Sequence, residues 1–220
     1  MSDLDTNLPV KIKLRARTCE EKAQRKQSIV EALKFLLSQS DELPSAIQIA
    51  QQAGVTKSVI YQYFNSREEI FLTLLIQLSE PLLELTQQHF NNVKEIQSEF
   101  IHYFLNNPLF MRLSLMAPVV LVMNVNSEIV KTFKLSASHI MIELAKTIMP
   151  FCDKNEETCK SFINSFYQLS LMKWRNCHPP KSVIKAFEGE EFWLINFDLE
   201  SELNLAFEWL WSGLNHSQTS

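Results

Sequence analysis

Glycine is scarce in this chain of 220 residues, which contains only Gly54, Gly189 and Gly213. Average usage of about 7% would supply roughly fifteen. The three glycines lie too far apart to form a phosphate-binding loop, which excludes nucleotide-binding folds of the P-loop and Rossmann types. Tight hairpins also use glycine for positive φ angles, so barrels and sandwiches are disfavoured. An all-α fold remains.

Cysteines and long apolar runs are also few. The four cysteines are Cys19, Cys152, Cys159 and Cys177. They form no CxxC pair and no metal-type cluster with histidine, so free thiols and no metal site are expected. The longest apolar runs, near 71–76 and 116–123, fall far short of the ~18 residues of a membrane span. Since the acidic start over 1–5 also lacks the form of a signal peptide, we expect a cytoplasmic protein without membrane contact.

Apolar residues and an uneven charge distribution are what the chain does have. Hydrophobic residues make up 46% of it and charged residues 21%, which is enough for a core and excludes disorder over most of its length. The net charge is −4, yet residues 11–28 carry +5 and the rest therefore −9. A basic segment beside an acidic remainder indicates a surface for a polyanion, although an ordinary solvated surface is the alternative.

Capping signals predict where the helices begin. A Ser or Thr followed three residues later by Glu or Gln satisfies free N–H groups at a helix start. Such pairs are Thr18 with Glu21, Ser45 with Gln48, and Ser66 with Glu69. Thr56 is a further expected cap. The expected helices cover 18–38, 45–53, 56–64, 67–90, 93–106, 108–116, 127–149, 155–177 and 199–214, with a kink at Pro81 and breaks at Pro118, Pro150, Pro179 and Pro180.

Residues 46–65 have the spacing of a helix-turn-helix. Gly54 takes the turn, and the small Ala50 lets two helices cross closely. Apolar residues fall at the expected contact positions, which are Ile49, Ala53, Val55, Ile60 and Tyr63. Any two short amphipathic helices around a glycine meet part of this pattern, so a structural helical hairpin is the alternative.

The run from Ile49 to Ile70, IAQQAGVTKSVIYQYFNSREEI, resembles the N-terminal domain of the tetracycline-repressor (TetR) family of bacterial regulators. The resemblance covers about residues 18–75, and the chain length and helical remainder are also similar to that family. Three positions depart from the family pattern, which usually has Gly at Ser58, Lys at Arg67, and often a polar or basic residue at Ile47.

The resemblance implies a domain organisation. It consists of a basic flexible arm over 1–17, a three-helix DNA-binding domain over 18–66, and a helical bundle over 67–220 that binds an effector and dimerises.

The helix expected over 56–64 carries side chains that suit DNA. Gln62 is able to pair with adenine, and Lys57 to reach guanine or phosphate. Arg67 and the basic arm would add charge for phosphate. The predicted DNA-binding residues are Thr56, Lys57, Ser58, Tyr61, Gln62, Tyr63 and Arg67. The alternative is that these residues only solvate a surface helix.

Large apolar side chains are numerous beyond residue 71, and most must be ordinary core. In a family whose central helices enclose a pocket, some would line it, and the scarcity of charge there favours an apolar or aromatic effector. The predicted ligand contacts are Tyr103, Phe104, Phe110, Met116, His139 and Phe166. Packing is the alternative for each of them, and His139 is expected to be a hydrogen-bonded core histidine.

The last two long helices carry apolar residues around much of their circumference. On a wheel of 100° per residue, Leu203 and Phe207 share one stripe while Leu205 and Trp209 point almost the opposite way. One intrachain core does not readily cover both faces, so a symmetric four-helix dimer interface is expected, as the resemblance also implies. The predicted interface residues are Ile163, Tyr167, Leu203, Phe207, Trp209 and Leu210. Burial beneath the segment 178–198 is the alternative.

Together these patterns predict a ligand-responsive regulator, most simply a repressor, that binds a palindromic double-stranded DNA operator as a homodimer. No Ser-His-Asp or paired-carboxylate arrangement stands out, so neither an enzyme nor a cofactor is expected. The alternatives are a helical protein-interaction adaptor and a small-molecule-binding enzyme without DNA readout.

Overall fold

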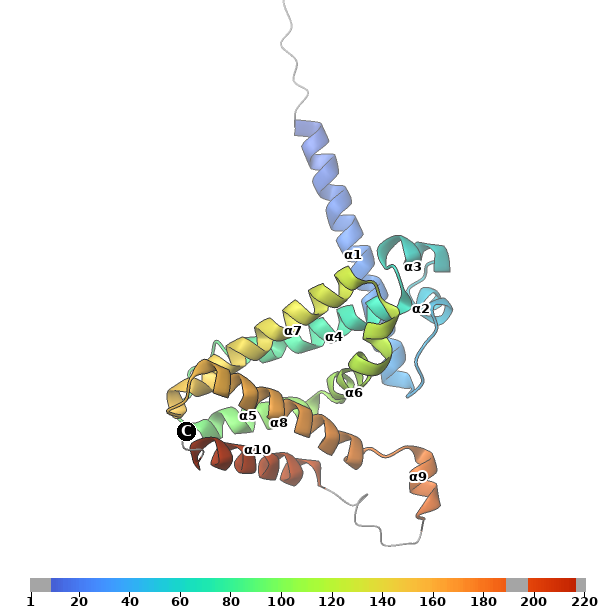
Figure 1. Ribbon diagram of the computed structural model, residues 1–220. Helices are drawn as coiled ribbons and strands as arrows, with labels where there is room; N and C mark the ends of the chain where they lie inside the picture. Colours follow the sequence, from blue (N-terminus) through green and yellow to red (C-terminus); the bar gives the residue numbers. More distant parts are fainter. Residues whose placement is uncertain (1–8, 189–197, 217–220) are drawn as a thin grey trace, which may run out of the picture. The chain divides into compact units, whose positions relative to one another are not determined.

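The computed structural model describes residues 9–188 and 198–216, and over 9–18 it describes the backbone alone. These residues form helices and connecting turns without strands (Figure 1), which confirms the all-α prediction. The α-helices are α1 (Pro9–Gln39), α2 (Ala46–Gln52), α3 (Lys57–Tyr63), α4 (Arg67–Leu85), α5 (Val93–Asn106), α6 (Pro108–Met116), α7 (Ser127–Ile148), α8 (Glu156–Cys177), α9 (Lys181–Ala186) and α10 (Leu199–His216). A π-helical turn at Ala117–Leu121 and short 3₁₀ turns at Val122–Asn124 and Met149–Phe151 complete the described helical structure.

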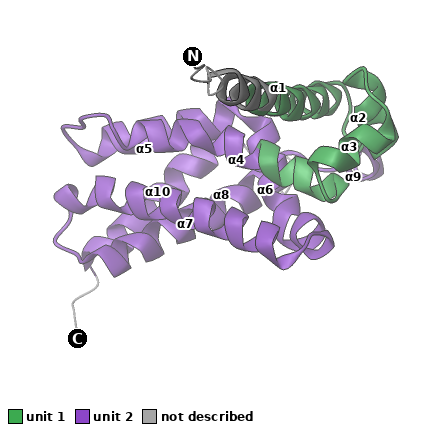
Figure 2. Ribbon diagram, turned by 90° about the horizontal axis from the view of Figure 1, so that it is seen from above, with its two compact units in different colours: residues 1–74 green, residues 75–220 purple. Residues whose placement is uncertain are grey.

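The chain divides into two compact units with a boundary between Leu74 and Leu75 (Figure 2). Unit 1 contains the described residues up to Leu74, and unit 2 contains those from Leu75 onward. The boundary falls inside α4, so this helix contributes residues to both units.

Helix α1 begins at Pro9 instead of Thr18. The predicted capping box of Thr18 with Glu21 is therefore wrong, and the arm expected over 1–17 is helical from Pro9 onward. The reason is local, because Lys, Arg, Leu and Ala are strong helix formers and no glycine or proline interrupts the chain between Pro9 and Gln39. Proline itself suits the first position of a helix, where its missing N–H is not needed. Residues 1–8 of the expected arm lie outside the described residues.

The other two predicted capping boxes are present, the second in altered form. At α2, Gln48 N–H donates to Ser45 Oγ at 3.3 Å, and Gln48 Oε1 accepts from Ser45 N–H at 2.8 Å. At α4, Glu69 N–H donates to Ser66 Oγ at 3.2 Å, but the Glu69 carboxylate accepts from the backbone N–H of Asn65 at 2.7 Å. The Glu69 carboxylate thus accepts a hydrogen bond from Asn65, whereas a standard capping box would use the N–H of Ser66.

The core of unit 1 holds the helix-turn-helix together. Ile49 and Ile60 are fully buried, and Ala50 is nearly so. Gly54 adopts a φ of 65°, in the left-handed region that suits glycine, and Val55 N–H donates to the carbonyl of Ala50 at 2.9 Å to close the turn. The remaining predicted contact positions, Ala53, Val55 and Tyr63, are half-buried.

Helix α8 is central to the packing of unit 2. It contacts α6, α7 and α10, and α10 also contacts α5. The ring centroid of Phe166 on α8 lies 5.9 Å from that of Phe104 on α5 and 5.1 Å from that of Phe207 on α10. Such ring pairs add to the free energy gained from burying apolar area.

Local signals determine the helix ends in unit 2. Asn92 caps α5 through its side-chain oxygen, which accepts from the N–H groups of Lys94 and Glu95, and Pro108 opens α6. Helix α4 ends at Leu85, five residues before the predicted end, because Thr86 and Gln87 N–H bond carbonyls three residues back and tighten the last turn.

Three of the predicted dimer residues are enclosed within unit 2. Leu203 is fully buried, Phe207 is 1% exposed and Ile163 is 3% exposed. They cannot form the surface of an interface, because α10 turns this apolar stripe toward α5 and α8 of its own chain. Trp209 is 61% exposed and Leu210 is half-buried, so part of the predicted second face does reach the surface.

Among the described residues, no helix taken singly has both the length and the apolar character needed to cross a membrane. The segments Val93–Asn106 and Pro108–Asn124 meet these criteria only as a pair, and they are bent by 82° at the break.

Leu203→Ala should lower the free energy of unfolding by about 2–5 kcal/mol, because it empties space in the unit 2 core. Leu135→Ala is the matched control, since Leu135 is 62% exposed on α7 and its truncation should change stability by less than about 0.5 kcal/mol. Urea unfolding followed by circular dichroism measures both. Equal effects would contradict the burial of the α10 stripe.

Candidate functional site

The predicted DNA-binding residues all belong to unit 1. Most of them lie on α3, while Thr56 directly precedes this helix and Arg67 begins α4. Five are exposed and two are half-buried. The exposed ones are Thr56, Lys57, Ser58, Tyr61 and Gln62, and the half-buried ones are Tyr63 and Arg67. Because Ile60 is fully buried, α3 turns its apolar side inward and presents a polar surface to solvent.

The hydroxyl groups at the start of α3 bond each other. Thr56 Oγ1 and Ser58 Oγ are 2.8 Å apart. Thr56 occupies the cap position as predicted, but its side chain makes no hydrogen bond to the N–H groups of the first turn. The side chain therefore does not perform the expected capping role.

A shallow groove joins α3 to the ends of α2 and α4 within unit 1. Its lining includes Ile47, Lys57, Tyr61 and Arg67. The ammonium of Lys57 lies 5.9 Å from the centre of the Tyr61 ring, a distance at which the ring face attracts a cation. Ile47 is 52% exposed, so the position where the family often has a polar residue presents an apolar side chain here.

Arg67 is paired with its neighbour in this groove. Its Nε and Nη2 both donate to Glu68 Oε1, at 3.0 and 2.7 Å. Its guanidinium also lies 5.8 Å from the centre of the Phe71 ring. The pairing orients the guanidinium but offsets its charge, so an anion at this place must compete with a carboxylate.

Tyr63 faces α1. It lines a hollow with Lys22, Arg25 and Ser28, which belong to the basic stretch of the sequence. On the same side of α1, Lys26 Nζ lies 5.0 Å from the centre of the buried Phe64 ring. The basic charge of α1 therefore continues beside the polar end of α3 in unit 1.

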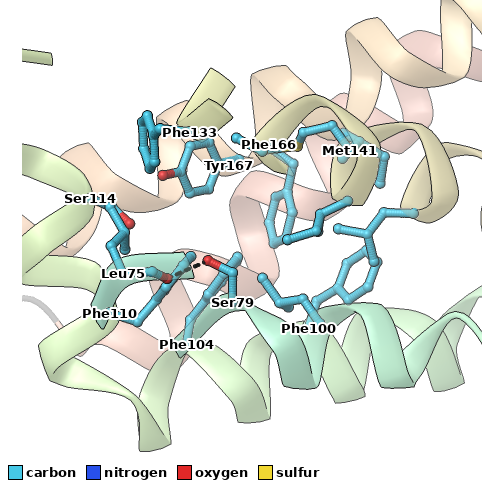
Figure 3. Close-up of a pocket in the computed structure, with 15 residues that line it drawn as sticks. Leu75, Ser79, Phe100, Phe104, Phe110, Ser114, Phe133, Met141, Phe166 and Tyr167 are labelled. Atoms are coloured by element: carbon cyan, nitrogen blue, oxygen red, sulfur yellow. Dashed lines mark hydrogen bonds between the residues drawn. The ribbon is translucent and has the colours of Figure 1, made fainter. Parts of the chain in front are cut away.

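Unit 2 contains an apolar cavity of about 80 Å³ (Figure 3). Residues from α4, α5, α6, α7 and α8 surround it. They are Leu75, Ser79, Leu82, Phe100, Phe104, Phe110, Ser114, Phe133, Ala137, Ile140, Met141, Leu144, Ile163, Phe166 and Tyr167. Charged side chains are absent from this lining.

The structure brings three of the six predicted ligand contacts to this cavity, namely Phe104, Phe110 and Phe166. Tyr103 is buried beside it and donates its hydroxyl hydrogen to the carbonyl of Leu78, and burial raises the pKa of its phenol. Met116 is half-buried and is not in the lining. His139 is exposed on α7, so its expected place in the core is wrong.

Sequence reasoning missed the polar part of the lining. The sequence pattern does not single out Ser79 and Ser114, and it predicts Tyr167 at the dimer interface. Helical spacing does mark the shared face, since Ile163, Phe166 and Tyr167 follow at intervals of three and four residues. It does not tell which residues of an apolar face border a void.

The three hydroxyl groups of the lining are neutral and differ in their bonding. Ser79 donates to the carbonyl of Leu75 at 2.7 Å (dashed in Figure 3). Ser114 Oγ is buried and has no hydrogen-bond partner at normal distance and angle among the described residues. Burial raises the pKa of Tyr167, and the neighbouring Ser114 hydroxyl opposes this rise in pKa.

The cysteines are free thiols, as predicted. Cys152 and Cys159 approach each other to 3.6 Å between sulfur atoms, and burial raises the pKa of Cys159 to about 12. Within 9–188 and 198–216, no group of three His, Cys, Asp or Glu side chains is placed to hold a metal ion.

Two family models match the chain. The model described as bacterial regulatory proteins of the tetR family matches residues 45–74. The model described as tetracyclin repressor-like, C-terminal domain, matches residues 78–218. A comparison with curated proteins finds no significant match.

Solved structures with the same fold include FadR of Thermus thermophilus, a TetR-family transcriptional repressor in complex with lauroyl-CoA. It is 14% identical, the match covers 88% of this chain and 97% of that one, and the TM-score is 0.59. A TetR transcriptional regulator from Rhodococcus sp. RHA1 is 16% identical, with 86% and 97% covered and a TM-score of 0.55. At these identities the likeness concerns the fold.

Glu68→Gln should strengthen binding to duplex DNA by about 1.5- to 5-fold at low salt, because it frees Arg67 from an ion pair of ordinary surface strength. Glu80→Gln is the control, since it removes the same charge from an exposed position farther along α4. Fluorescence anisotropy with labelled duplex measures both. Equal gains would mean that net charge, and not the release of Arg67, controls affinity.

Proposed function

The chain belongs to the TetR family of transcriptional regulators, and we propose that it acts in the cytoplasm as a repressor that binds a double-stranded operator and responds to a small effector. The observation that supports the DNA-binding part is the exposed polar face of α3 within residues 45–74, which the model of tetR-family regulatory proteins matches. On this proposal the protein is not an enzyme.

We assign base reading to the exposed middle of α3. Gln62 has a side-chain amide able to pair with adenine in the major groove, and Tyr61 lies beside it with an exposed hydroxyl. Lys57 at the start of the helix reaches guanine acceptors or phosphate.

We assign backbone contacts to the groups around this centre. Arg67 supplies a guanidinium for phosphate, and the hydroxyl groups of Thr56, Ser58 and Tyr63 are able to donate to phosphate oxygens. These contacts set the position of α3 on the duplex without reading sequence. The basic residues of α1 add attraction that weakens with salt.

The cavity of unit 2 is the proposed effector site. Its phenylalanine lining suits an apolar chain or ring, in keeping with a charge-free environment. The T. thermophilus protein of the same fold is in complex with lauroyl-CoA. An apolar effector body is therefore the part of a ligand that this cavity would accept.

Helix α4 is the covalent link through which effector and operator would influence each other. Arg67 begins it, and Leu75, Ser79 and Leu82 on its second part line the cavity. An effector shifts DNA affinity only if it binds two conformations unequally. A typical coupling changes affinity by about 5- to 150-fold, and by reciprocity the operator must weaken inducer binding by the same factor.

The proposed dimer uses the outer faces of α8 and α10. Met172 is 38% exposed, Leu205 36% and Trp209 61%, and the two helices pack side by side (Figure 1). Exposed apolar residues on adjacent helices indicate an association surface. Pairing of this face with its symmetry mate would form a four-helix interface.

Selection of bound duplexes from a random library, followed by mobility shift, tests the proposed function. A two-fold dimer should enrich near-palindromes whose half-sites are about one helical turn, 34–36 Å, apart. Uniform binding to all sequences, or no binding, would favour an adaptor or a ligand-binding enzyme.

Gln62→Ala should lower the preference for the selected operator over random duplex by about 1–3 kcal/mol, because it removes a base contact. Arg67→Ala should weaken binding to both and reduce the slope of log K against log salt by about one unit, because one phosphate contact is lost. Titrations at several salt concentrations separate the two. Equal losses of affinity for both duplexes in Gln62→Ala would mean that Gln62 contacts the DNA backbone and not a base.

Leu205→Asp combined with Trp209→Asp should convert the dimer to a folded monomer, because it places charge in the proposed seam while leaving the buried α10 stripe intact. Leu135→Asp is the control, as another exposed apolar residue on α7. Sedimentation at micromolar concentration reports the assembly state. A wild-type monomer, or a doubly substituted dimer, would refute the interface.

A further inference from the structure

The cavity in unit 2 is apolar except for one polar region. Twelve of its fifteen lining residues are apolar, and the other three, Ser79, Ser114 and Tyr167, carry hydroxyl groups. The side chains of Ser114 and Tyr167 lie close to each other (Figure 3). Ser79, in contrast, donates its hydroxyl hydrogen to the carbonyl of Leu75. The chemistry of these three groups restricts what the cavity accepts.

The hydroxyl of Ser114 lies near that of Tyr167 but makes no hydrogen bond of normal geometry to a described residue. Ser79 already donates to Leu75, whereas Ser114 is 3% exposed and its Oγ has no normal hydrogen-bond partner among the described residues. A buried hydroxyl without a partner destabilises a fold, so such groups usually have a partner that the protein alone does not supply. Tyr167 adds a second donor, because its phenol carries a hydroxyl hydrogen at neutral pH and burial raises its pKa further.

The lining also determines which charge state is accepted. A carboxylate or phosphate placed among these residues would lose its hydration and find no cation. A neutral oxygen needs only the two hydroxyl donors. The five phenylalanines, Phe100, Phe104, Phe110, Phe133 and Phe166, offer ring faces and edges to an aromatic group.

We infer that the effector is an uncharged ligand with a ring-sized apolar body and one oxygen, as in a ketone, ester or lactone, that accepts a hydrogen bond from Ser114 and from Tyr167. This inference rests on the proposed effector site. The cavity of about 80 Å³ is near half the ~150 Å³ of an engineered cavity that holds benzene. A ring therefore enters only when the lining moves apart, and such a ligand binds the two conformations unequally.

Three probes of one ring size test the inference: acetophenone, ethylbenzene and benzoate. Calorimetry on the full chain gives the affinity ratio of acetophenone to ethylbenzene. Ser114→Ala should lower this ratio by about 2- to 12-fold, the range for one net hydrogen bond. Tyr167→Phe should lower it too. Ser79→Ala is the matched control and should leave it unchanged, because that hydroxyl already donates to its own helix. Benzoate should not bind saturably.

Two further measurements locate the effect and check folding. Ala137→Leu fills the cavity and should weaken both neutral probes together. Thermal unfolding should show that Ser114→Ala is at least as stable as the wild type without ligand, because it removes an unpartnered hydroxyl. An unchanged ratio in Ser114→Ala, benzoate binding equal to that of acetophenone, or no binding of either neutral probe would overturn the inference.

Mobility shift on the same preparations separates this inference from the proposed function. Operator binding without any probe binding overturns the ligand class and leaves the regulator in place. Probe binding with the expected ratios but without DNA binding supports the ligand class and overturns the regulator.

Discussion

The ring of Phe166 packs between aromatic side chains of α5 and α10, and the arrangement of unit 2 depends on this burial. Its centroid lies 6.4 Å from that of Phe100 and 5.1 Å from that of Phe207. Phe207 belongs to the apolar stripe of α10 that faces inward, and Phe166 also borders the cavity. One buried side chain thus joins the structural core to the candidate ligand site.

This arrangement explains why apolar residues occur both at the cavity and at the proposed dimer surface. Side chains packed around Phe166 are nearly all apolar, so the residual space there is charge-free and selects for neutral ligands. The outer sides of α8 and α10 carry apolar residues that are not buried in the core, including Met172, Leu205 and Trp209. Both proposals about unit 2 therefore follow from how two helices divide their apolar residues between an inner and an outer face.

In unit 1 the corresponding constraint is the short helix α3. Burial of Ile49 and Ile60 and the left-handed turn at Gly54 hold α2 against α3. With its apolar residues committed to this contact, α3 has only polar side chains for its exposed face. Arg67 is paired with Glu68 on the same surface, so the Glu68 carboxylate competes with a bound anion for this guanidinium.

Sequence alone is sufficient to predict the helical class, the ends of α5 and α6, the turn at Gly54, the family and the exposed polar face of α3. These features depend on interactions between residues close in the chain, such as caps, turns and helical period. It missed the start of α1 at Pro9, because a helix of strong formers needs no capping signal to continue.

Tertiary packing places Phe207 and Leu203 in the core and not at an interface, leaves His139 exposed, and brings Ser114 and Tyr167 to the border of a cavity. A helical wheel shows which face is apolar but not which neighbour covers it. Where packing leaves space depends on the shapes of side chains from five helices at once.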